Sequence, residues 1–515
     1  MVTGFVIRKN EYHDSVFLMR VAKTISEKEG VLQAAALMGT EKNKGLLGDI
    51  GIRGPEITAA TPQDLVLAIQ AEGQEVLDEL IENIDRWLHP ATESEIHSSV
   101  RTLEEALHHR PHSNLTVISL PGEYAGREVR RALELGLNVF LFSDHVPLEE
   151  EISLKKLARE KGLIVMGPDC GTAIIGGAGV GFANRVRRGP IGVIGASGTG
   201  IQEFTSLVHR AGSGISQAIG TGSRDFSDAV GGLSFLSAME ALEADPQTQL
   251  IAILSKPPGK MALATLAPRI SRCPKPVIVC FLGFKEYLLA GPASHKLART
   301  LDEAAMLAVQ AVAGRPELMA APDSSRIENL IQKEWVGKTS AQKYLRGLFA
   351  GGTFCYQAQQ ILQEYGMKAY SNAPLEGNPQ LPKSAISMEH TLVDMGADEF
   401  TSGRPHPMID SRWRYDRILT EARDREIGIL LLDIILGFNS CPDPAGDLAP
   451  AIRAAKREIN RRGGSLSVIA SICGTEDDAQ DLNRQTKILE DAGALVFPSS
   501  AQAVRFSALL AKNFS

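Results

Sequence analysis

A strand, a turn of small residues and a helix follow one another in Gly189–Glu203, and this arrangement constrains the fold most. The strand is the apolar run Ile191–Ile194, and the helix begins near Thr199. Glycines in the turn let backbone N–H groups approach a ligand, and the positive end of the helix dipole favours an anion there. A similar turn follows the apolar strand Leu345–Phe349. Two such turns predict an α/β chain that holds a phosphate or carboxylate between two helix N-termini, although tight packing explains either turn alone.

The residues of these two turns are the candidate phosphate and substrate ligands. Each turn combines glycines with hydroxyl side chains, which add donors to the backbone N–H groups. The predicted set is Ser197, Gly198, Thr199, Gly200, Gly351, Gly352 and Thr353.

Length, charge and cysteine content bound the class of protein. The 515 residues suffice for roughly three or four domains. A net charge of −7 gives no basic face for nucleic acid, and no apolar run reaches the ~18 residues of a membrane helix. No signal peptide is apparent, and the six cysteines are scattered without a CxxC pair. The sequence therefore predicts a cytoplasmic protein that binds neither nucleic acid nor membrane.

Alternating strands and helices predict a multidomain α/β fold. The expected parts are a small N-terminal α/β module over residues 1–110, a Rossmann-type domain over 111–187, a flavodoxin-like domain over 188–315, a linker over 316–343 and a second flavodoxin-like domain over 344–515. The two flavodoxin-like parts share their order of elements, with a glycine turn first and a strongly apolar strand after the next helix. We interpret them as a degenerate internal duplication.

The Rossmann-type part carries a second, doubtful ligand site. Gly122 follows its first strand, where a dinucleotide or CoA phosphate would lie, but Glu123 places a negative charge there. Its last strand ends at Gly167, Asp169 and Cys170. Cys170 could be a nucleophile, but a small packed thiol is the favoured interpretation. CoA is thus a candidate cofactor that Glu123 disfavours, and no other cofactor and no metal is predicted.

The order of modules and a set of short motifs resemble the succinyl-CoA synthetase superfamily, and within it the FdrA-type proteins. The motifs are Met166–Ile174, Gly195–Glu203, Gly220–Asp225, Asp245–Thr248, Ser255–Pro258, Gly351–Thr353 and Gly403–Asp410. The resemblance covers nearly the whole chain. It implies that the Rossmann-type part corresponds to the CoA-binding domain of a synthetase α-subunit. The two flavodoxin-like parts then correspond to ligase domains of the α- and β-subunits.

The chain departs from the synthetase pattern where phosphate is relayed. The family's phosphohistidine lies in a Gly-His-Ala-Gly loop, whereas His295 here lacks that frame. The family's orienting glutamate is replaced by Lys256, which can bind a phosphoryl oxygen but cannot orient a histidine as a carboxylate does. A structural pairing of Lys256 with Asp225 is the alternative. The first 110 residues are also too short for a nucleotide-binding ATP-grasp domain, so we expect neither a phosphohistidine nor a nucleotide site.

Other side chains could take part in catalysis or binding. Arg404 could bind a carboxylate and His406 could act as general acid or base, with Asp398 nearby in sequence. A proline-stiffened structural loop is the alternative for these three. Arg224, in the motif Gly220–Asp225, is a further candidate for binding phosphate.

For two more groups of side chains a structural role explains the sequence at least as well as a functional one. Asp443 and Asp447 follow an apolar strand, but helix capping explains at least one of them. The histidines at 108, 109 and 112 are interpreted as a solvated linker rather than a metal site.

Three functions remain open from the sequence. The first is an enzyme subunit that transfers an acyl-type group to or from phosphate, with Lys256, Arg404 and His406 as catalytic residues. The resemblance to FdrA-type proteins implies a carbamoyltransferase acting on carbamoyl phosphate and a small acid such as oxamate, in an oligomer with other protein subunits. The second is an ADP-forming acyl-CoA synthetase subunit, which CoA binding would reveal. The third is a non-catalytic regulator, which would not need a tight phosphate site.

Overall fold

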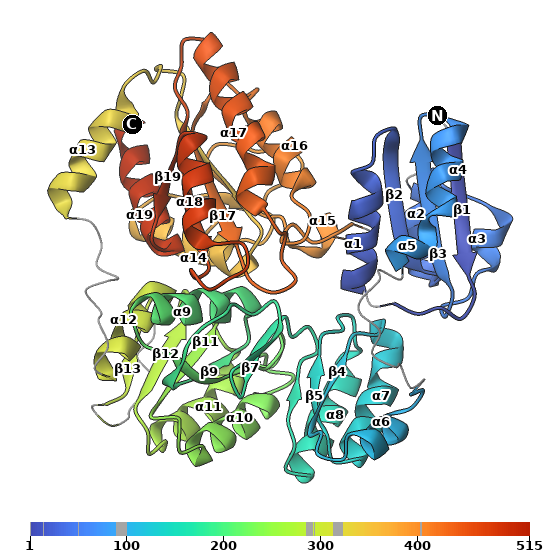
Figure 1. Ribbon diagram of the computed structural model, residues 1–515. Coiled ribbons are helices and arrows are strands. Elements are labelled where there is room, and N and C mark those ends of the chain that lie inside the picture. Colours follow the sequence, from blue (N-terminus) through green and yellow to red (C-terminus); the bar gives the residue numbers. More distant parts are fainter. Residues whose placement is uncertain are drawn as a thin grey trace. The chain divides into compact units, whose positions relative to one another are not determined.

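The computed structural model describes residues 2–13, 15–49, 51–88, 100–284, 292, 294–312, 323–401 and 404–514. These residues form two compact units (Figure 1). The first comprises Met1–His112 together with Asp398–Asp410, and the second comprises Ser113–Ala397 with Ser411–Ser515. The loop at 398–410 therefore belongs with the N-terminal module, although it lies far away in sequence.

The N-terminal module is a three-stranded sheet between two layers of helices. The strand order is β1-β3-β2, and both pairs are antiparallel. The central strand β3 is buried almost throughout because one layer of helices packs Leu77 and Leu80 on one face while the other packs Leu47 and Ile57 on the opposite face. Its elements are β1 Val2–Arg8, α1 Ser15–Ser26, β2 Val31–Met38, α2 Glu41–Asp49, α3 Pro55–Ala59, β3 Leu65–Ala71, α4 Gln74–Glu82, α5 Ile84–Leu88 and α6 Leu103–His109.

The Rossmann-type part is a parallel sheet of order β4-β5-β6. Its elements are β4 Leu115–Ile118, α7 Gly122–Glu134, β5 Asn138–Leu141, α8 Leu148–Glu160 and β6 Val165–Met166. The next strands, β7 Thr172–Ile175 and β8 Ala178–Gly181, form a hairpin that pairs with the following sheet instead. Gly176 and Gly177 turn this hairpin with φ of 60° and 88°, the left-handed conformation that glycine adopts without strain.

The first flavodoxin-like domain supplies the order β13-β12-β11-β9-β10 to the seven-stranded sheet. Numbered along the domain this is the order 2-1-3-4-5, typical of flavodoxin-like folds. Its elements are β9 Arg188–Gly195, α9 Gly198–Arg210, β10 Ile215–Gly220, α10 Leu233–Ala244, β11 Leu250–Ser255, α11 Lys260–Ser271, β12 Val277–Phe281, β13 Lys296–Leu297 and α12 Leu301–Ala311.

The second flavodoxin-like domain has the same order, with the short β15 added at its edge, giving β15-β16-β14-β17-β18-β19. All its pairs are parallel. The segment assigned as linker contains the helix α13 Ser324–Trp335, none of whose side chains is buried. The other elements are β14 Tyr344–Phe349, α14 Gly352–Glu364, β15 Tyr370–Ser371, β16 Thr391–Asp394, α16 Arg412–Glu421, β17 Ile427–Ile435, α17 Pro444–Arg461, β18 Ser467–Cys473, α18 Leu482–Asp491, β19 Ala494–Phe497, α19 Ser500–Ala511 and the 3-10 turn Lys512–Phe514. The short helix α15 Asp398–Thr401 lies between β16 and α16 in sequence but belongs to the first unit.

The two flavodoxin-like domains exchange equivalent contacts, as an internal duplication predicts. Glu203 on α9 accepts a hydrogen bond from the first-turn N–H of Ser500, 3.0 Å away on the last helix of the second domain. Gln357 occupies the same place on α14 and accepts from Leu301, 2.9 Å away on the last helix of the first domain. The predicted α/β multidomain fold class is therefore confirmed, and α9 and α14 lie in matching environments.

Candidate functional site

The first glycine turn joins β9 to α9. Ser197 is the N-cap of α9, and its Oγ accepts a hydrogen bond from the N–H of Gly200 at 3.0 Å. In the part of the chain that the structure describes, the N–H groups of Gly198 and Thr199 have no acceptor. Because the first N–H groups of a helix carry its positive dipole, this turn can receive an anion.

The second turn joins β14 to α14 and is built differently. Its N-cap is Gly351, which has no side chain to cap the helix. The carboxylate of Asp433 on β17 instead accepts hydrogen bonds from the N–H groups of Ala350, at 2.8 and 3.1 Å, and of Gly351, at 2.8 Å. A Cβ on Gly352 would lie 2.5 Å from Oδ2 of Asp394. Carboxylates of the chain therefore already occupy this helix N-terminus.

Asp433 is held in a buried ion pair. Nη2 of Arg414 on α16 lies 2.9 Å from its Oδ1, and both side chains are almost fully buried. Burial raises the pKa of Asp433 and lowers the pKa of Arg414, while each charge offsets part of the shift of the other. The charges of Asp433 and Arg414 therefore largely offset each other, and the carboxylate of Asp394 also lies at the second turn.

The two turns meet. The hydroxyl oxygens of Ser197 and Thr353 are in direct hydrogen-bond contact. A Cβ on Gly351 would lie 3.1 Å from the Thr199 methyl carbon, and one on Gly200 would lie 3.5 Å from that of Thr353. The structure therefore brings the residues predicted from the two turns together at the boundary of the two flavodoxin-like domains.

Lys256 follows the end of β11, next to the point where the strand order of the first domain reverses. Its ammonium lies 5.5 Å from the centre of the Tyr356 ring on α14, so it faces the second flavodoxin-like domain as expected. The place of Lys256 at the carboxyl end of a central strand, followed by two prolines, predicts a buried side chain that needs a compensating anion, and this prediction is wrong because the side chain is exposed. Its suggested pairing with Asp225 is also wrong.

Asp225 belongs to a buried cluster at the junction with the Rossmann-type part. Lys155 on α8 lies 2.8 Å from Asp225 and 2.9 Å from Glu151. Arg224 binds Glu151 at 2.8 Å and donates to the carbonyl of Val146 at 2.7 Å. The predicted phosphate ligand Arg224 is therefore engaged in joining two parts of the fold.

The residues of the doubtful CoA-like site are glycines and a thiol in tight packing. A Cβ on Gly122 would lie 2.1 Å from the carbonyl oxygen of Asp144, and one on Gly167 would lie 2.3 Å from that of Leu141. Burial raises the pKa of Cys170 to about 12, so its thiol stays protonated, as a packed thiol should. Asp169 lies in the left-handed region with φ 56° and is exposed.

Asp398, Arg404 and His406 belong to the unit formed with the N-terminal module, whereas the two turns belong to the other unit. Nδ1 of His406 accepts a hydrogen bond from the N–H of Met408 at 3.2 Å, and its carbonyl accepts from Ile409 at 2.8 Å. These bonds shape the local loop.

The remaining candidates have structural partners. Nε2 of His295 lies 3.0 Å from the carbonyl of Ile270. Asp443 is the N-cap residue of α17 and binds Arg484 at 2.9 Å. Asp447 accepts from the thiol of Cys441 at 3.0 Å.

The sequence analysis missed Asp433 and Arg414. A signal was available, since Asp433 is the lone charge in the strand sequence IGILLLDII, which is buried at every position. A charge in a fully buried strand requires a partner, and this requirement points to a functional or structural ion pair.

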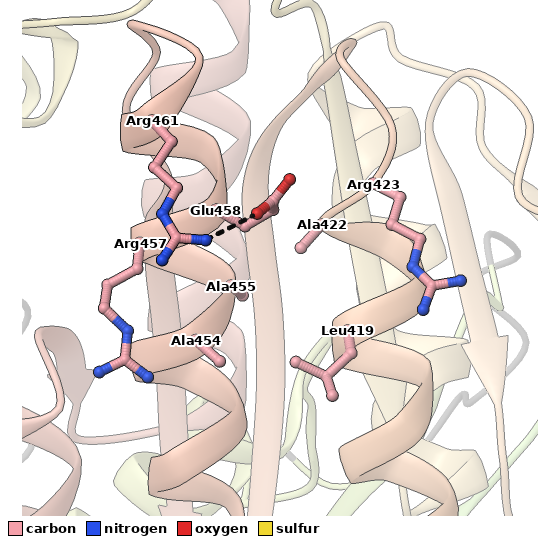
Figure 2. A pocket seen from close by; sticks show the side chains of 8 residues that line it. All are labelled: Leu419, Ala422, Arg423, Ala454, Ala455, Arg457, Glu458 and Arg461. Carbon is pink, nitrogen blue, oxygen red and sulfur yellow. Dashed lines mark ion pairs between the residues drawn. The ribbon is translucent and has the colours of Figure 1, made fainter.

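A groove of about 400 Å³ between α16 and α17 lies away from the turns (Figure 2). It is lined by Leu419, Ala422, Arg423, Ala454, Ala455, Arg457, Glu458 and Arg461. The last turns of α17 form it, at the amino ends of the parallel strands, whereas the glycine turns follow the carboxyl ends. Arg462 beside it donates to the carbonyls of Ala422 and Arg423 at 3.3 and 2.9 Å, as basic residues do at helix C-termini. We therefore do not assign the groove to the site.

The described ranges contain no group of three or more His, Cys, Asp or Glu side chains that could hold a metal ion. No helix within them is both long and apolar enough to cross a membrane.

Both flavodoxin-like domains match family models whose descriptions name CoA. A family model described as CoA-ligase matches residues 348–510, and one described as a CoA binding domain matches residues 186–270. A model described as the AllF heavy metal-associated domain matches residues 1–104. The CoA-binding match thus falls on the first flavodoxin-like domain, whereas the sequence analysis assigned the CoA-like role to residues 111–187.

One relative spans the whole chain. The Escherichia coli K12 protein described as uncharacterized protein YahF is 41% identical over 515 residues, which is 100% of this chain and 99% of that protein. The α-subunit of ADP-forming succinate–CoA ligase from Methanothermobacter thermautotrophicus is 27% identical over 173 residues, 33% of this chain and 57% of that protein. A solved structure of dinucleotide-forming acetyl-coenzyme A synthetase 1 from Ca. Korarchaeum cryptofilum aligns over 78% of this chain and 84% of its own, with 16% identity and a TM-score of 0.31.

Proposed function

The chain belongs to the family of the Escherichia coli protein YahF, within the acyl-CoA synthetase and succinyl-CoA ligase superfamily, and from this premise we propose that it is a group-transferring enzyme subunit. It transfers an acyl-type group to or from phosphate, without a nucleotide site or phosphohistidine of its own. The observation that carries the proposal is the meeting of the two glycine turns through Ser197 and Thr353.

The proposed phosphate position is the turn of α9. Within the described ranges its Gly198 and Thr199 N–H groups lack acceptors, as do the equivalent Gly352 and Thr353 N–H groups of α14. A dianion placed at the second turn would however lie against the Asp394 carboxylate beside Gly352, and like charges in a buried site repel strongly. Phosphate bound by α9 would also have the Thr353 hydroxyl as a donor from the opposite domain.

We propose a carbamoyl group as the one transferred, following the resemblance to FdrA-type proteins. An amine or amide nitrogen of the acceptor, such as oxamate, attacks the carbonyl carbon of carbamoyl phosphate. A new C–N bond forms, the C–O bond to phosphate breaks, and inorganic phosphate leaves with the electron pair. The acceptor nitrogen gives up its proton to a base, and Lys256 is proposed to stabilise the leaving phosphate.

An ADP-forming acyl-CoA synthetase subunit is the second candidate, and the CoA-ligase and CoA-binding matches favour it. Its nucleotide site would come from another chain. A CoA phosphate placed at the turn of α7 would meet the exposed Glu123 in the first turn of that helix. Lys256 in place of the orienting glutamate also opposes the synthetase chemistry.

Two measurements on the full chain separate these candidates. Calorimetric titration should detect carbamoyl phosphate and inorganic phosphate, with little or no heat from CoA. Incubation with labelled nucleoside triphosphate, with or without CoA, should leave no acid-labile phosphohistidine. Tight CoA binding together with stoichiometric label on His295 would restore the synthetase function.

A further inference from the structure

Thr172 carries a buried hydroxyl that has no hydrogen-bond partner. It opens β7, directly after the turn Gly167–Gly171, and 1% of its surface is exposed. Its Oγ1 is buried and has no hydrogen-bond partner among the residues that the structure describes. A buried hydroxyl without a partner costs free energy, and native proteins retain such groups rarely.

The free hydroxyl lies against the first turn of α9. A Cβ on Gly198 would lie 3.3 Å from Oγ1 of Thr172, and its next neighbour would be Cα of Gly171 at 3.7 Å. The N–H of Gly198 is one of the two first-turn donors that lack an acceptor in the described part of the chain. An unpaired hydroxyl and unpaired helix donors therefore occupy the same place.

The surrounding contacts fix the backbone of Thr172. Its carbonyl oxygen accepts a hydrogen bond from the thiol of Cys170 at 3.6 Å. A Cβ on Gly220 would lie 2.5 Å from that oxygen, so the neighbouring strand allows the threonine little freedom to move away. The backbone of Thr172 is consequently held beside α9.

We propose that the Thr172 hydroxyl is a donor to the anion at the α9 turn and forms the floor of its site. This inference rests on the proposed function, and it adds a residue from outside both glycine turns. The ligand is an oxyanion with several acceptor oxygens, of the phosphate class. Such an ion can accept from the N–H groups of Gly198 and Thr199 and from the hydroxyls of Thr172 and Thr353 at the same time.

The test compares stability and phosphate affinity in one variant. Thr172→Val keeps the shape of the side chain and removes the hydroxyl. Replacing an unpaired buried polar group by an apolar isostere does not destabilise the fold, so the denaturation midpoint should be unchanged or higher. Phosphate affinity, measured by calorimetry on the full chain, should fall about tenfold or more, the usual effect of losing a hydrogen bond to a charged group.

Two controls keep the inference open to refutation. Thr172→Ser retains the hydroxyl and should keep its phosphate affinity. Thr205→Val alters a buried threonine of α9 whose hydroxyl donates to the Gln202 carbonyl at 3.2 Å, and it should lower stability without changing phosphate affinity. A Thr172→Val protein that binds phosphate like the wild type, or that is destabilised as Thr205→Val is, would overturn the inference.

The proposed function and this inference fail in distinguishable ways. If the wild-type chain binds no phosphate, the proposed function fails and the role of Thr172 fails with it. If the wild type binds phosphate and Gly198→Val abolishes binding while Thr172→Val does not weaken it, the proposed function stands and only the role of Thr172 is refuted.

Discussion

The turns of α9 and α14 have the same place in two copies of one fold, yet their chemistry differs. In the first domain, the N–H of Ala196 donates to the backbone carbonyl of Leu254 at 3.1 Å. In the second, the N–H of Ala350 donates to the side chain of Asp433, which occupies the position equivalent to Leu254. Within the described residues the N–H groups of Gly198, Thr199, Gly352 and Thr353 all lack acceptors, and the second turn differs in having the carboxylates of Asp433 and Asp394 beside it.

The two strands beside these turns differ in the charge at their carboxyl ends. Lys256 follows β11 in the first domain, whereas Ile435 holds the equivalent place at the end of β17. The two flavodoxin-like domains have thus diverged. The first presents a lysine that can attract an anion, whereas the second holds a buried ion pair whose charges offset each other. A duplicated fold need not produce a symmetric ligand site, and a single bound phosphate is the expected stoichiometry.

The largest effect on stability should come from removing the Asp433 carboxylate beside the turn of α14. Asp433→Ala leaves the Arg414 guanidinium buried without its partner and should reduce the free energy of unfolding by about 3–5 kcal/mol. Urea denaturation followed by circular dichroism measures it. The double variant Asp433→Leu with Arg414→Leu, which imitates the first domain, should recover much of this loss, and a loss below ~1 kcal/mol for Asp433→Ala would refute the structural role of the pair.

Substitution of Lys256 tests the proposed role of the first flavodoxin-like domain in group transfer. Lys256→Met should leave the fold intact because the side chain is exposed. It should lower group transfer to phosphate by about 2–4 kcal/mol of transition-state stabilisation, as when an oxyanion donor is removed. The assay needs the partner subunits. Lys256→Glu should do no better, and near-normal turnover in Lys256→Met would remove this residue from the mechanism.

Glu203 and Gln357 make a titratable and a non-titratable version of one contact. Burial raises the pKa of Glu203 to about 7 in the folded chain from an ordinary value near 4.5. A carboxyl group whose pKa is higher in the folded chain stabilises the fold most at pH values below its pKa in the unfolded chain. Stability should therefore fall as the pH rises from about 4.5 through 7, by ~3 kcal/mol at most.

The matched variant removes that pH dependence. Glu203→Gln should still accept from Ser500, as Gln357 accepts from Leu301, and its denaturation midpoint should vary less between pH 5 and 8. Gln357→Glu should introduce a similar loss of stability at high pH, through the equivalent contact between α14 and Leu301. Parallel pH profiles for wild type and Glu203→Gln would contradict the assignment.

The smallest expected effect concerns the caps. Ser197→Ala removes the side-chain cap of α9 and should cost about 1 kcal/mol of stability, typical of an N-cap serine. Thr353→Val should cost less, because Thr353 lies within α14 and caps nothing. Thermal unfolding of both variants ranks them, and an equal cost would show that the contact between the two hydroxyls, rather than the cap, provides the stabilisation.

Much of the fold follows from the sequence because its parallel strands are buried on both faces. The runs Ile251–Leu254 and, apart from Asp433, Gly428–Leu436 are apolar, and the bounds of β11 and β17 lie within one residue of these runs. The sequence analysis did not predict the hairpin β7–β8, because it treated this segment as the end of the Rossmann-type part. The pair Gly176-Gly177 between two short apolar strands was the available signal.

The candidate site was harder to predict because contacts between domains decide its charge. The glycine turns are local patterns, and their mutual approach followed from the duplication. The partner of Asp433 is Arg414, which lies 19 residues away on another element, so no spacing rule connects them. The exposure of Lys256 and the pairing of Asp225 with Lys155 likewise depend on how α8 and β11 pack, which the sequence pattern does not contain.

Calorimetric titration of the full chain with inorganic phosphate tests the central claim most directly. Gly198→Val places a branched side chain beside the open N–H groups of α9, whereas Gly73→Val does the same at the N-cap of α4, where an added Cβ meets nothing within 4 Å. We predict one phosphate per chain for the wild type and for Gly73→Val, and no binding for Gly198→Val. Undiminished phosphate binding by a folded Gly198→Val protein would contradict the assignment of the anion to the α9 turn.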